Sequence, residues 1–184
     1  AILNYAKDKL RWYPREFHSR LCEIVQTFIE DETGHPYDIM LLSTPPQVGK
    51  SVTITETLPS WYLGRYPENR VIELSYGADF AKRFGRRNRE KINEFGFIFG
   101  IGLKSDTKSV EEFELSNGLG GMVSTGVGGS VTGRKCNLLI IDDPIKNRED
   151  ADSERYRNKV WEEWVNSFKT RLSAGAKVIV IQTR

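Results

Sequence analysis

The sequence predicts one α/β domain with a mostly parallel sheet flanked by helices. Short apolar runs rich in β-branched residues alternate with amphipathic patterns of about 12 to 20 residues, which is typical of strand–helix–strand units. Two of these runs lead into residue types that bind phosphate or Mg²⁺ in α/β proteins. A chain of 184 residues with nine Phe and four Trp can bury the core of one domain and is too short for two.

The expected elements follow from the period of the apolar residues. Consecutive aliphatic residues predict strands at 38–42, 70–75, 110–115, 121–124, 136–143 and 177–184, with a hairpin turn at Asn117-Gly118. Helical spacing predicts helices at 15–31, 50–63, 78–95 and 150–172. The apolar faces of the last two helices are expected to be buried: Phe80, Ala81, Phe84 and Ile92 on one, and Tyr156, Val160, Trp164, Val165 and Phe168 on the other.

The stretch from Ser43 to Ser51 ends in Gly49-Lys50-Ser51 and joins an expected strand to an expected helix. Backbone N–H groups and the positive end of a helix dipole bind anionic oxygens at such a junction. Lys50 would add a full charge at the β- and γ-phosphates, and the Ser51 hydroxyl would ligate Mg²⁺. Thr44 stands where the pattern G-x-x-x-x-G-K-[ST] has its first glycine, so an ordinary strand-to-helix turn remains the alternative.

The strand at 136–143 ends in Asp142-Asp143. Open α/β sheets bind ligands at the carboxyl ends of their strands, so this pair is expected to face the Gly-Lys-Ser loop. Asp142 would hold Mg²⁺ opposite Ser51, and Asp143 would orient or deprotonate the attacking water. Asp-Asp-Pro also favours a plain turn. The loop and the acidic pair together predict a P-loop NTPase that uses ATP and Mg²⁺.

Composition bears on whether the protein binds nucleic acid or metal, spans a membrane or is secreted. The net charge of +2 does not by itself indicate a nucleic-acid-binding protein, and Cys22 and Cys136 lack metal-ligand spacing, which predicts reduced structural thiols. No apolar run approaches the roughly 20 residues of a membrane span, and no signal-peptide pattern is present. A soluble, intracellular protein without a membrane partner is therefore expected. The chain stops on an expected core strand, which indicates part of a longer protein.

Several sequence blocks, in order along the chain, resemble the large terminase subunit of tailed bacteriophages. They are Thr-Pro-Pro-Gln-Val-Gly-Lys-Ser at 44–51, Pro-Ser-Trp-Tyr-Leu-Gly-Arg-Tyr-Pro at 59–67, Leu-Ser-Tyr-Gly at 74–77, Gly-Gly-Ser-Val-Thr-Gly-Arg at 128–134, Leu-Ile-Ile-Asp-Asp-Pro-Ile-Lys at 139–146 and Gln-Thr-Arg at 182–184. The resemblance covers nearly the whole chain from about residue 12. It implies a RecA-like P-loop fold of the additional-strand type.

The resemblance also implies a function. Residues 1–184 would form a single ATPase domain, with 1–37 as a helical segment on the adenine side and 38–184 as the P-loop core. Such domains drive double-stranded viral DNA into a procapsid. Expected partners are the portal protein, the small terminase subunit and further copies in a ring, with a monomer in isolation, in the bacterial host cytoplasm. The nuclease domain expected in the full-length protein would lie outside this chain, which shows no cluster of nuclease acids.

The same resemblance assigns roles around the phosphates. The backbone of Gln47, Val48 and Gly49 would cradle the phosphates beside Lys50 and Ser51. At the position of Asp143 the family usually has Glu, which is one methylene longer, and Glu149 is the alternative residue for activating water. Gln182, Thr183 and Arg184 would couple hydrolysis to domain motion.

Other assignments lie farther from the loop. Arg134 would act as an arginine finger on a neighbouring subunit's ATP, although it could instead contact DNA or carboxylates of its own chain. Tyr13 or Phe17 would stack on the adenine, with a polar contact from Arg15 or His18. His18 could equally be a helix cap or a surface residue. The basic face that includes Arg83, Arg86 and Arg87 would bind DNA phosphates, face another subunit, or be solvated.

Two other functions are compatible with these residues. A helicase-type DNA translocase would share the fold and would have a second RecA-like domain. A weakly hydrolysing nucleotide-dependent scaffold is suggested by the incomplete phosphate loop and by aspartate at position 143.

Overall fold

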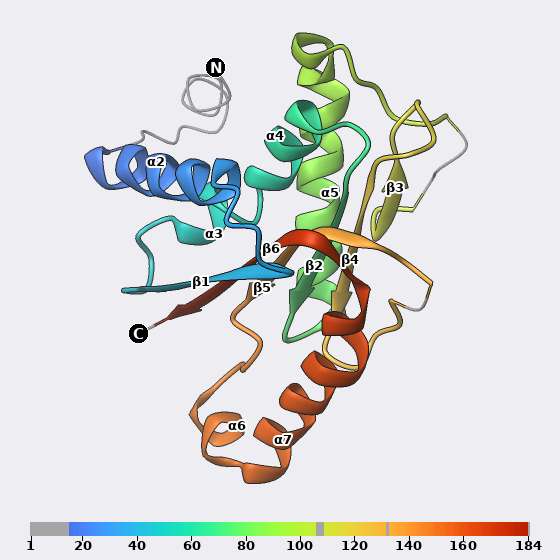
Figure 1. The fold of residues 1–184 in the computed structure, drawn as a ribbon. Helices are drawn as coiled ribbons and strands as arrows, with labels where there is room; N and C mark the ends of the chain where they lie inside the picture. The colour runs from blue at the N-terminus through green and yellow to red at the C-terminus, as the bar shows by residue number, and fades with distance from the viewer. Residues whose placement is uncertain (1–14, 106–108, 132, 184) are drawn as a thin grey trace.

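A six-stranded sheet with helices on both faces organises the chain, and the computed structural model describes residues 15–105, 109–131 and 133–183 (Figure 1). All neighbouring strands are parallel except the pair of β3 and β4, which forms the predicted hairpin-like edge. Across the sheet the strands are β1 (Tyr37–Thr44), β6 (Leu172–Thr183), β5 (Cys136–Asp142), β2 (Arg70–Ser75), β4 (Gly121–Gly126) and β3 (Glu112–Glu114).

The order of the strands positions the site. Strand β6 lies between β1, which leads into the phosphate loop, and β5, which ends at Asp142. Thr44 of β1 pairs with Thr183 of β6, and Asp142 of β5 pairs with Ile181 of β6, so the three strands end together. A strand inserted between the two motif-bearing strands is the additional-strand arrangement, and this expectation is confirmed.

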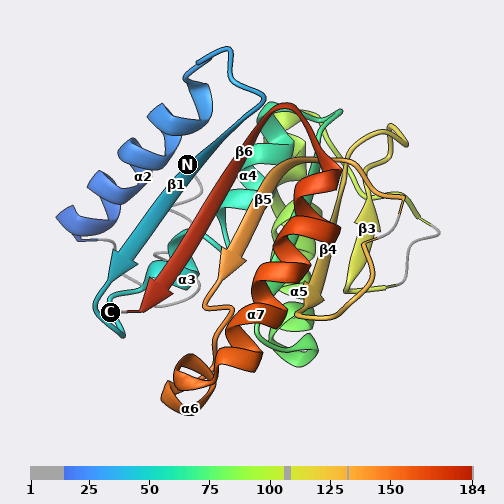
Figure 2. The same cartoon turned by 60° about the horizontal axis from the view of Figure 1, so that its bottom comes forward.

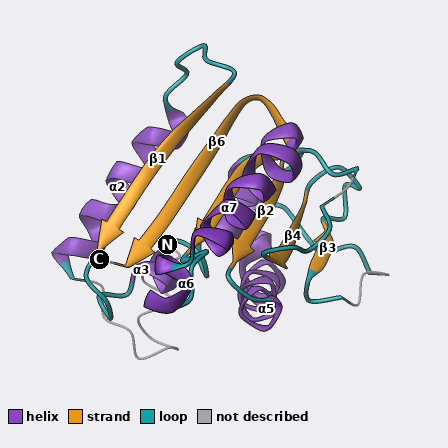
Figure 3. Cartoon of the chain, turned by 90° about the horizontal axis from the view of Figure 1, so that it is seen from below, coloured by secondary structure: helices purple, strands orange, loops and turns teal. Residues whose placement is uncertain are grey.

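The helices cover the sheet unequally. Figures 2 and 3 show α7 in front of the sheet and α5 behind it. In chain order the helical segments are α2 (Glu16–Glu30), α3 (Lys50–Thr53), α4 (Leu58–Arg65), α5 (Ala78–Phe95), η1 (Gly96–Phe99), α6 (Arg148–Asp152), α7 (Glu154–Glu163), the π-helical η2 (Trp164–Phe168) and η3 (Lys169–Arg171).

Each face of the sheet has its own core. The larger core joins α2, α4 and α5 to the strands through residues such as Val25, Leu63 and Ile140. The smaller core packs Phe168 of η2 against the opposite face. Cys22 and Cys136 are free thiols as predicted, and burial raises the pKa of Cys136 to about 12, so this thiol stays protonated.

Two expected helices are interrupted. The helix predicted at 50–63 stops after Thr53 and resumes at Leu58. Five of the six residues from Val52 to Thr57 are β-branched, and restricted χ1 rotamers lower their helix propensity. The helix predicted at 150–172 breaks at Ser153, whose side chain accepts from the N–H of Tyr156 and starts α7. These interruptions correct the two continuous helices expected from apolar spacing.

The buried faces are also smaller than expected. Helix α7 has no buried residue, and of the five apolar residues predicted to be buried on the 150–172 helix only Phe168 is buried, 1% exposed. The remaining four are partly or largely accessible, with Val165 38% exposed. Phe80 of α5 is 41% exposed, whereas Ala81, Phe84 and Ile92 are buried as predicted. Within the described residues, no helix has the length and apolar content needed to cross a membrane.

Candidate active site

The phosphate loop turns through two left-handed residues. Gln47 has φ of 61° and Gly49 has φ of 84°, and Gly49 directly precedes α3. Left-handed residues within a tight turn point successive N–H groups to one side, which creates an anion-binding concavity. Because α3 is only four residues long, the dipole of a longer helix expected here contributes little. The backbone nest of the loop is therefore the main feature that favours an anion.

Lys50 connects the ends of three strands. Its side chain is 9% exposed, and Nζ donates to Oδ2 of Asp143 at 2.7 Å and to the hydroxyl of Thr183. The same aspartate accepts from the backbone N–H of Thr183 at 2.7 Å and from its hydroxyl at 2.8 Å. Asp143 has φ of 42°, and this left-handed turn after β5 directs its carboxylate towards β6. The predicted residues Lys50, Asp143 and Thr183 thus meet.

Asp142 lies beside this cluster and is 3% exposed. Burial raises its pKa, while the nearby hydroxyl groups of Thr55 and Ser51 oppose the rise. Oδ2 accepts from the Thr55 hydroxyl at 2.6 Å, whereas Oδ1 is buried and has no hydrogen-bond partner among the described residues. A carboxylate oxygen left free beside a serine hydroxyl suits Mg²⁺, which takes oxygen ligands from one or two carboxylates plus substrate phosphates. Among the described residues, no group of three or more His, Cys, Asp or Glu side chains is arranged so that it could hold a metal ion.

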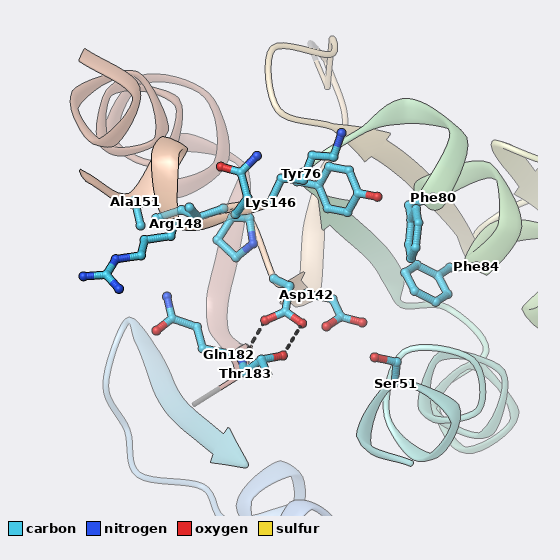
Figure 4. Close-up of a pocket in the computed structure, with 14 residues that line it drawn as sticks. Ser51, Tyr76, Phe80, Phe84, Asp142, Lys146, Arg148, Ala151, Gln182 and Thr183 are labelled. Carbon is cyan, nitrogen blue, oxygen red and sulfur yellow. Dashed lines mark hydrogen bonds between the residues drawn. The ribbon is translucent and has the colours of Figure 1, made fainter. Parts of the chain in front are cut away.

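A cleft of about 640 Å³ opens above the acidic pair. Its lining includes Ser51, Gln182 and Thr183 (Figure 4). The aromatic wall consists of Tyr76, Phe80 and Phe84, and the loop after β5 adds Lys146 and Arg148. Nζ of Lys146 lies 5.9 Å from the centroid of the Tyr76 ring. Phe80 is partly exposed because it lines this cleft.

His18 ties the N-terminal helix to the phosphate loop. Its Nδ1 accepts from the N–H of Arg15 at 2.8 Å, so the proton is on Nε2, which donates to the carbonyl of Val48 at 2.8 Å. The side chain is 6% exposed. The cap interpretation is therefore confirmed and the surface interpretation is wrong. Phe17 is 41% exposed with its ring edge-on to His18, Arg15 is exposed, and Tyr13 lies outside the described residues.

Two catalytic candidates lie away from the cleft. Arg134 pairs bidentately with Glu112 of β3, with Nε and Nη2 at 3.0 and 2.6 Å from the two carboxylate oxygens. This contact is the own-chain alternative foreseen for Arg134, and it lowers the pKa of Glu112. Glu149 is exposed in the first turn of α6 and does not line the cleft, whereas Asp143 does. Arg184 lies outside the described residues.

The basic face of α5 makes several intrachain contacts. Arg83 pairs with Oε1 of the buried Glu56 at 3.2 Å, and Lys91 donates to the carbonyl of Glu56. Arg87 pairs with Glu90 at 3.5 Å on the same helix, and Arg86 is exposed. Part of this face therefore anchors the interrupted helix after the phosphate loop.

Sequence reasoning missed three buried polar residues near the site. Thr55 contacts Asp142, Asn88 contacts Thr55, and Glu73 lies on β2 with no exposure. Burial, together with the nearby charge of Asp142, raises the pKa of Glu73 to about 8, against a hydrogen bond from Ser75. The β-branched run around Thr55 is the one local signal that points to any of them.

Comparisons with known structures agree with this fold. The large terminase of bacteriophage HK97 aligns with a TM-score of 0.56 and 13% identity over 93% of this chain and 33% of that one. The large terminase of a thermophilic bacteriophage gives 0.53 and 12%, over 87% and 37%. The ATPase domain of the Thermus phage P74-26 large terminase gives 0.54 and 12%, over 98% and 69%. The chain therefore spans only about a third of the two whole terminases.

Sequence comparison assigns the family. No curated protein sequence matches the chain significantly. The sequence model for the N-terminal part of the terminase large subunit, T4-like-virus type, matches residues 41–184 and so covers most of the chain, including the phosphate loop and the acidic pair. The additional-strand sheet of the chain agrees with the fold of the similar structures. The match to the sequence model shows that this chain belongs to the family of N-terminal domains of terminase large subunits.

Proposed function

We propose that this chain is the ATP-hydrolysing motor domain of a genome-packaging terminase and translocates double-stranded viral DNA into a procapsid. The observation that carries the proposal is the meeting of Lys50, Asp143 and Thr183 beside Asp142, where three parallel strands end. A cation, a free carboxylate oxygen and a backbone nest that favours an anion lie at one edge of the sheet, and phosphoryl transfer uses groups of these kinds.

Binding would begin with an exchange of partners. The backbone of Gln47, Val48 and Gly49 receives the phosphates, and Ser51 and Asp142 would hold Mg²⁺, which neutralises phosphate charge. Before ATP binds, Lys50 is neutralised by Asp143. Phosphate oxygens would replace that carboxylate at Nζ because they carry more negative charge. The exchange frees Asp143 at the moment when ATP occupies the loop.

Hydrolysis then follows from the released carboxylate. Asp143 would orient a water molecule, whose oxygen bonds to the γ-phosphorus while the bond from phosphorus to the β,γ-bridging oxygen breaks. The proton of the water passes to the carboxylate, and ADP and phosphate are the products. Thr183 contacts both Lys50 and Asp143, so changes at either group reach β6 directly. Gln182 and Arg184 would share this coupling role.

Assembly would complete the site. A guanidinium group stabilises the negative charge on a transferred phosphoryl group through bidentate hydrogen bonds. The phosphate loop of this chain contains no arginine. Arg134 would leave Glu112 and reach the ATP of a neighbouring subunit in a homo-oligomeric ring. The portal protein, the small terminase subunit and viral DNA are the other proposed partners, with Arg83, Arg86 and Arg87 as candidate DNA or subunit contacts. The site of action would be the bacterial host cytoplasm.

The test begins with two substitutions. Lys50→Ala should weaken ATP binding about tenfold or more, because it removes charge-assisted hydrogen bonds to phosphate. Asp142→Ala should abolish hydrolysis while leaving metal-free nucleotide binding nearly unchanged. Titration calorimetry measures binding, and phosphate release measures turnover.

Lys104→Ala is the matched control for the lysine substitution. This lysine is 43% exposed and pairs with Glu114 of β3, the strand at the opposite edge of the sheet from β1. The Lys104→Ala variant should bind and hydrolyse ATP like the wild type. ATPase activity that survives both Lys50→Ala and Asp142→Ala would refute the site assignment.

A further inference from the structure

The interruption between α3 and α4 forms a turn directly behind the acidic pair. The chain leaves α3 after Thr53, and the N–H of Glu56 donates to the carbonyl of Ser51 at 2.8 Å, five residues back. This spacing is wider than that of an α-helix, so the residues between are displaced from the helical path. The turn brings Thr55 towards the end of β5.

Thr55 hydrogen-bonds to one of the two carboxylate oxygens of Asp142. Its side chain is fully buried, and Oγ1 donates to Oδ2 at 2.6 Å. The other oxygen, Oδ1, remains buried without a partner among the residues that the structure describes. A hydrogen bond to one oxygen fixes the rotation of the carboxylate and thereby sets where the second oxygen points. A regular helix through this segment would not present Thr55 in the same way.

Helix α5 holds the turn in place. Asn88 is fully buried, and its Nδ2 donates to the carbonyl of Thr55 at 2.8 Å and to that of Phe84 at 3.0 Å. Its Oδ1 accepts from the N–H of Ser60 at 3.1 Å. The bonds to Thr55 and Ser60 fasten the backbone within the interruption and in the first turn of α4 to a single side chain of α5.

We propose that Thr55, held by Asn88, is a positioning residue that orients Asp142 for Mg²⁺. The inference rests on the proposed function, since Asp142 is the metal-side carboxylate of that site. Groups that hydrogen-bond metal-ligating carboxylates orient them, and their removal weakens metal binding. A purely structural hydroxyl would instead satisfy a buried oxygen without affecting how nucleotide binding responds to Mg²⁺.

The test compares ATP affinity in Mg²⁺ with ATP affinity in EDTA, measured by calorimetry on the full-length protein. Thr55→Val keeps the β-branched shape and removes the hydroxyl. It should weaken ATP binding about tenfold in Mg²⁺ and leave binding in EDTA unchanged. Thr55→Ser restores the hydroxyl and should restore the wild-type ratio. If valine prevents folding, Thr55→Ala carries the same expectation.

The control is Thr57→Val, in the same turn. The Thr57 hydroxyl donates to the carbonyl of Val52 at 2.7 Å and does not contact Asp142. This variant should keep the wild-type ratio of affinities in Mg²⁺ and EDTA. A wild-type ratio in Thr55→Val, or the same loss in Thr57→Val, overturns the positioning role. Absence of Mg²⁺-dependent ATP binding by the wild type overturns the proposed function as well.

Discussion

The raised pKa of Glu73 predicts an unusual dependence of the free energy of unfolding on pH. Its carboxyl group is fully buried on β2, and burial together with the charge of Asp142 raises its pKa from 4.5 to about 8. Between these two values the folded protein keeps a proton that the unfolded chain releases. The stabilisation is complete below pH 4.5 and is lost as pH rises towards 8. The free energy of unfolding should fall by about 1.4 kcal/mol per pH unit in that range.

Glu73→Gln isolates this contribution. The amide has the same shape as the protonated acid and does not titrate. We expect the variant to gain on the wild type as pH rises, by about 3 kcal/mol between about pH 5 and about pH 7.5. Urea denaturation followed by circular dichroism at several pH values gives the two free energies of unfolding. Their difference cancels the contributions of titrating groups that do not interact with Glu73.

Glu90→Gln serves as the control for the loss of a carboxylate. The Glu90 side chain is 55% exposed on α5 and pairs with Arg87 at 3.5 Å. The stability of this variant should differ from that of the wild type by a small amount that does not depend on pH in this range. If Glu73→Gln and the wild type change in parallel from acid to neutral pH, Glu73 is ionised in the folded protein and the reasoning is refuted.

Two further predictions concern assembly and packing. A mixture of the Arg134→Ala and Lys50→Ala variants should recover part of the ATPase activity that each lacks alone, because one chain then supplies the arginine and the other the intact loop. No recovery at any mixing ratio would exclude action between subunits. Gly85→Ala should destabilise the fold by about 1–3 kcal/mol, because a Cβ there would lie 2.2 Å from the carbonyl oxygen of Val110. Gly77→Ala, where nothing lies within 4 Å, is its control in thermal denaturation, and equal losses in the two variants would contradict the packing argument.

Strands and helices were predictable from the sequence where the signal is local. Residues 70–75 and 78–95 have the predicted bounds, because an unbroken aliphatic run and a regular apolar period each define one element without help from distant residues. The insertion of β6 between β1 and β5 is different. Apolar periodicity gives no order of strands, and the additional-strand arrangement was expected from the family resemblance alone.

The two interrupted helices show where periodicity fails. Apolar spacing continues through 50–63, yet the β-branched residues there favour a turn that Asn88 then fastens from another helix. Spacing across 150–172 likewise predicted one buried face, but of its five apolar residues only Phe168 is buried, while Trp164 packs against the core and stays partly exposed. In both segments tertiary contacts decide which apolar positions are covered, and a sequence pattern does not contain those contacts.

The residues of the site likewise divide into those that a short motif identifies and those whose role depends on a partner distant in sequence. Lys50, Asp142 and Asp143 were identifiable because each lies in a short motif whose chemistry needs that residue type. Thr55 was not identifiable as a site residue, and the contact of His18 with the phosphate loop was not foreseen. Each of the two acts through a partner distant in sequence: 87 residues separate Thr55 from Asp142, and 30 separate His18 from Val48. A threonine hydroxyl gains meaning only when the fold places a buried carboxylate against it.

The positive groups assigned to catalysis are both neutralised within the chain. Lys50 is paired with Asp143, and Arg134 is paired with Glu112. For Lys50 the incoming phosphate itself supplies the replacement anion, so ATP alone can open that pair. Arg134 does not line the cleft, so ATP bound there by the same chain would not replace Glu112 as its partner. Under the proposed function, ATP binding therefore requires only this chain, whereas rapid hydrolysis requires a neighbour whose ATP replaces Glu112.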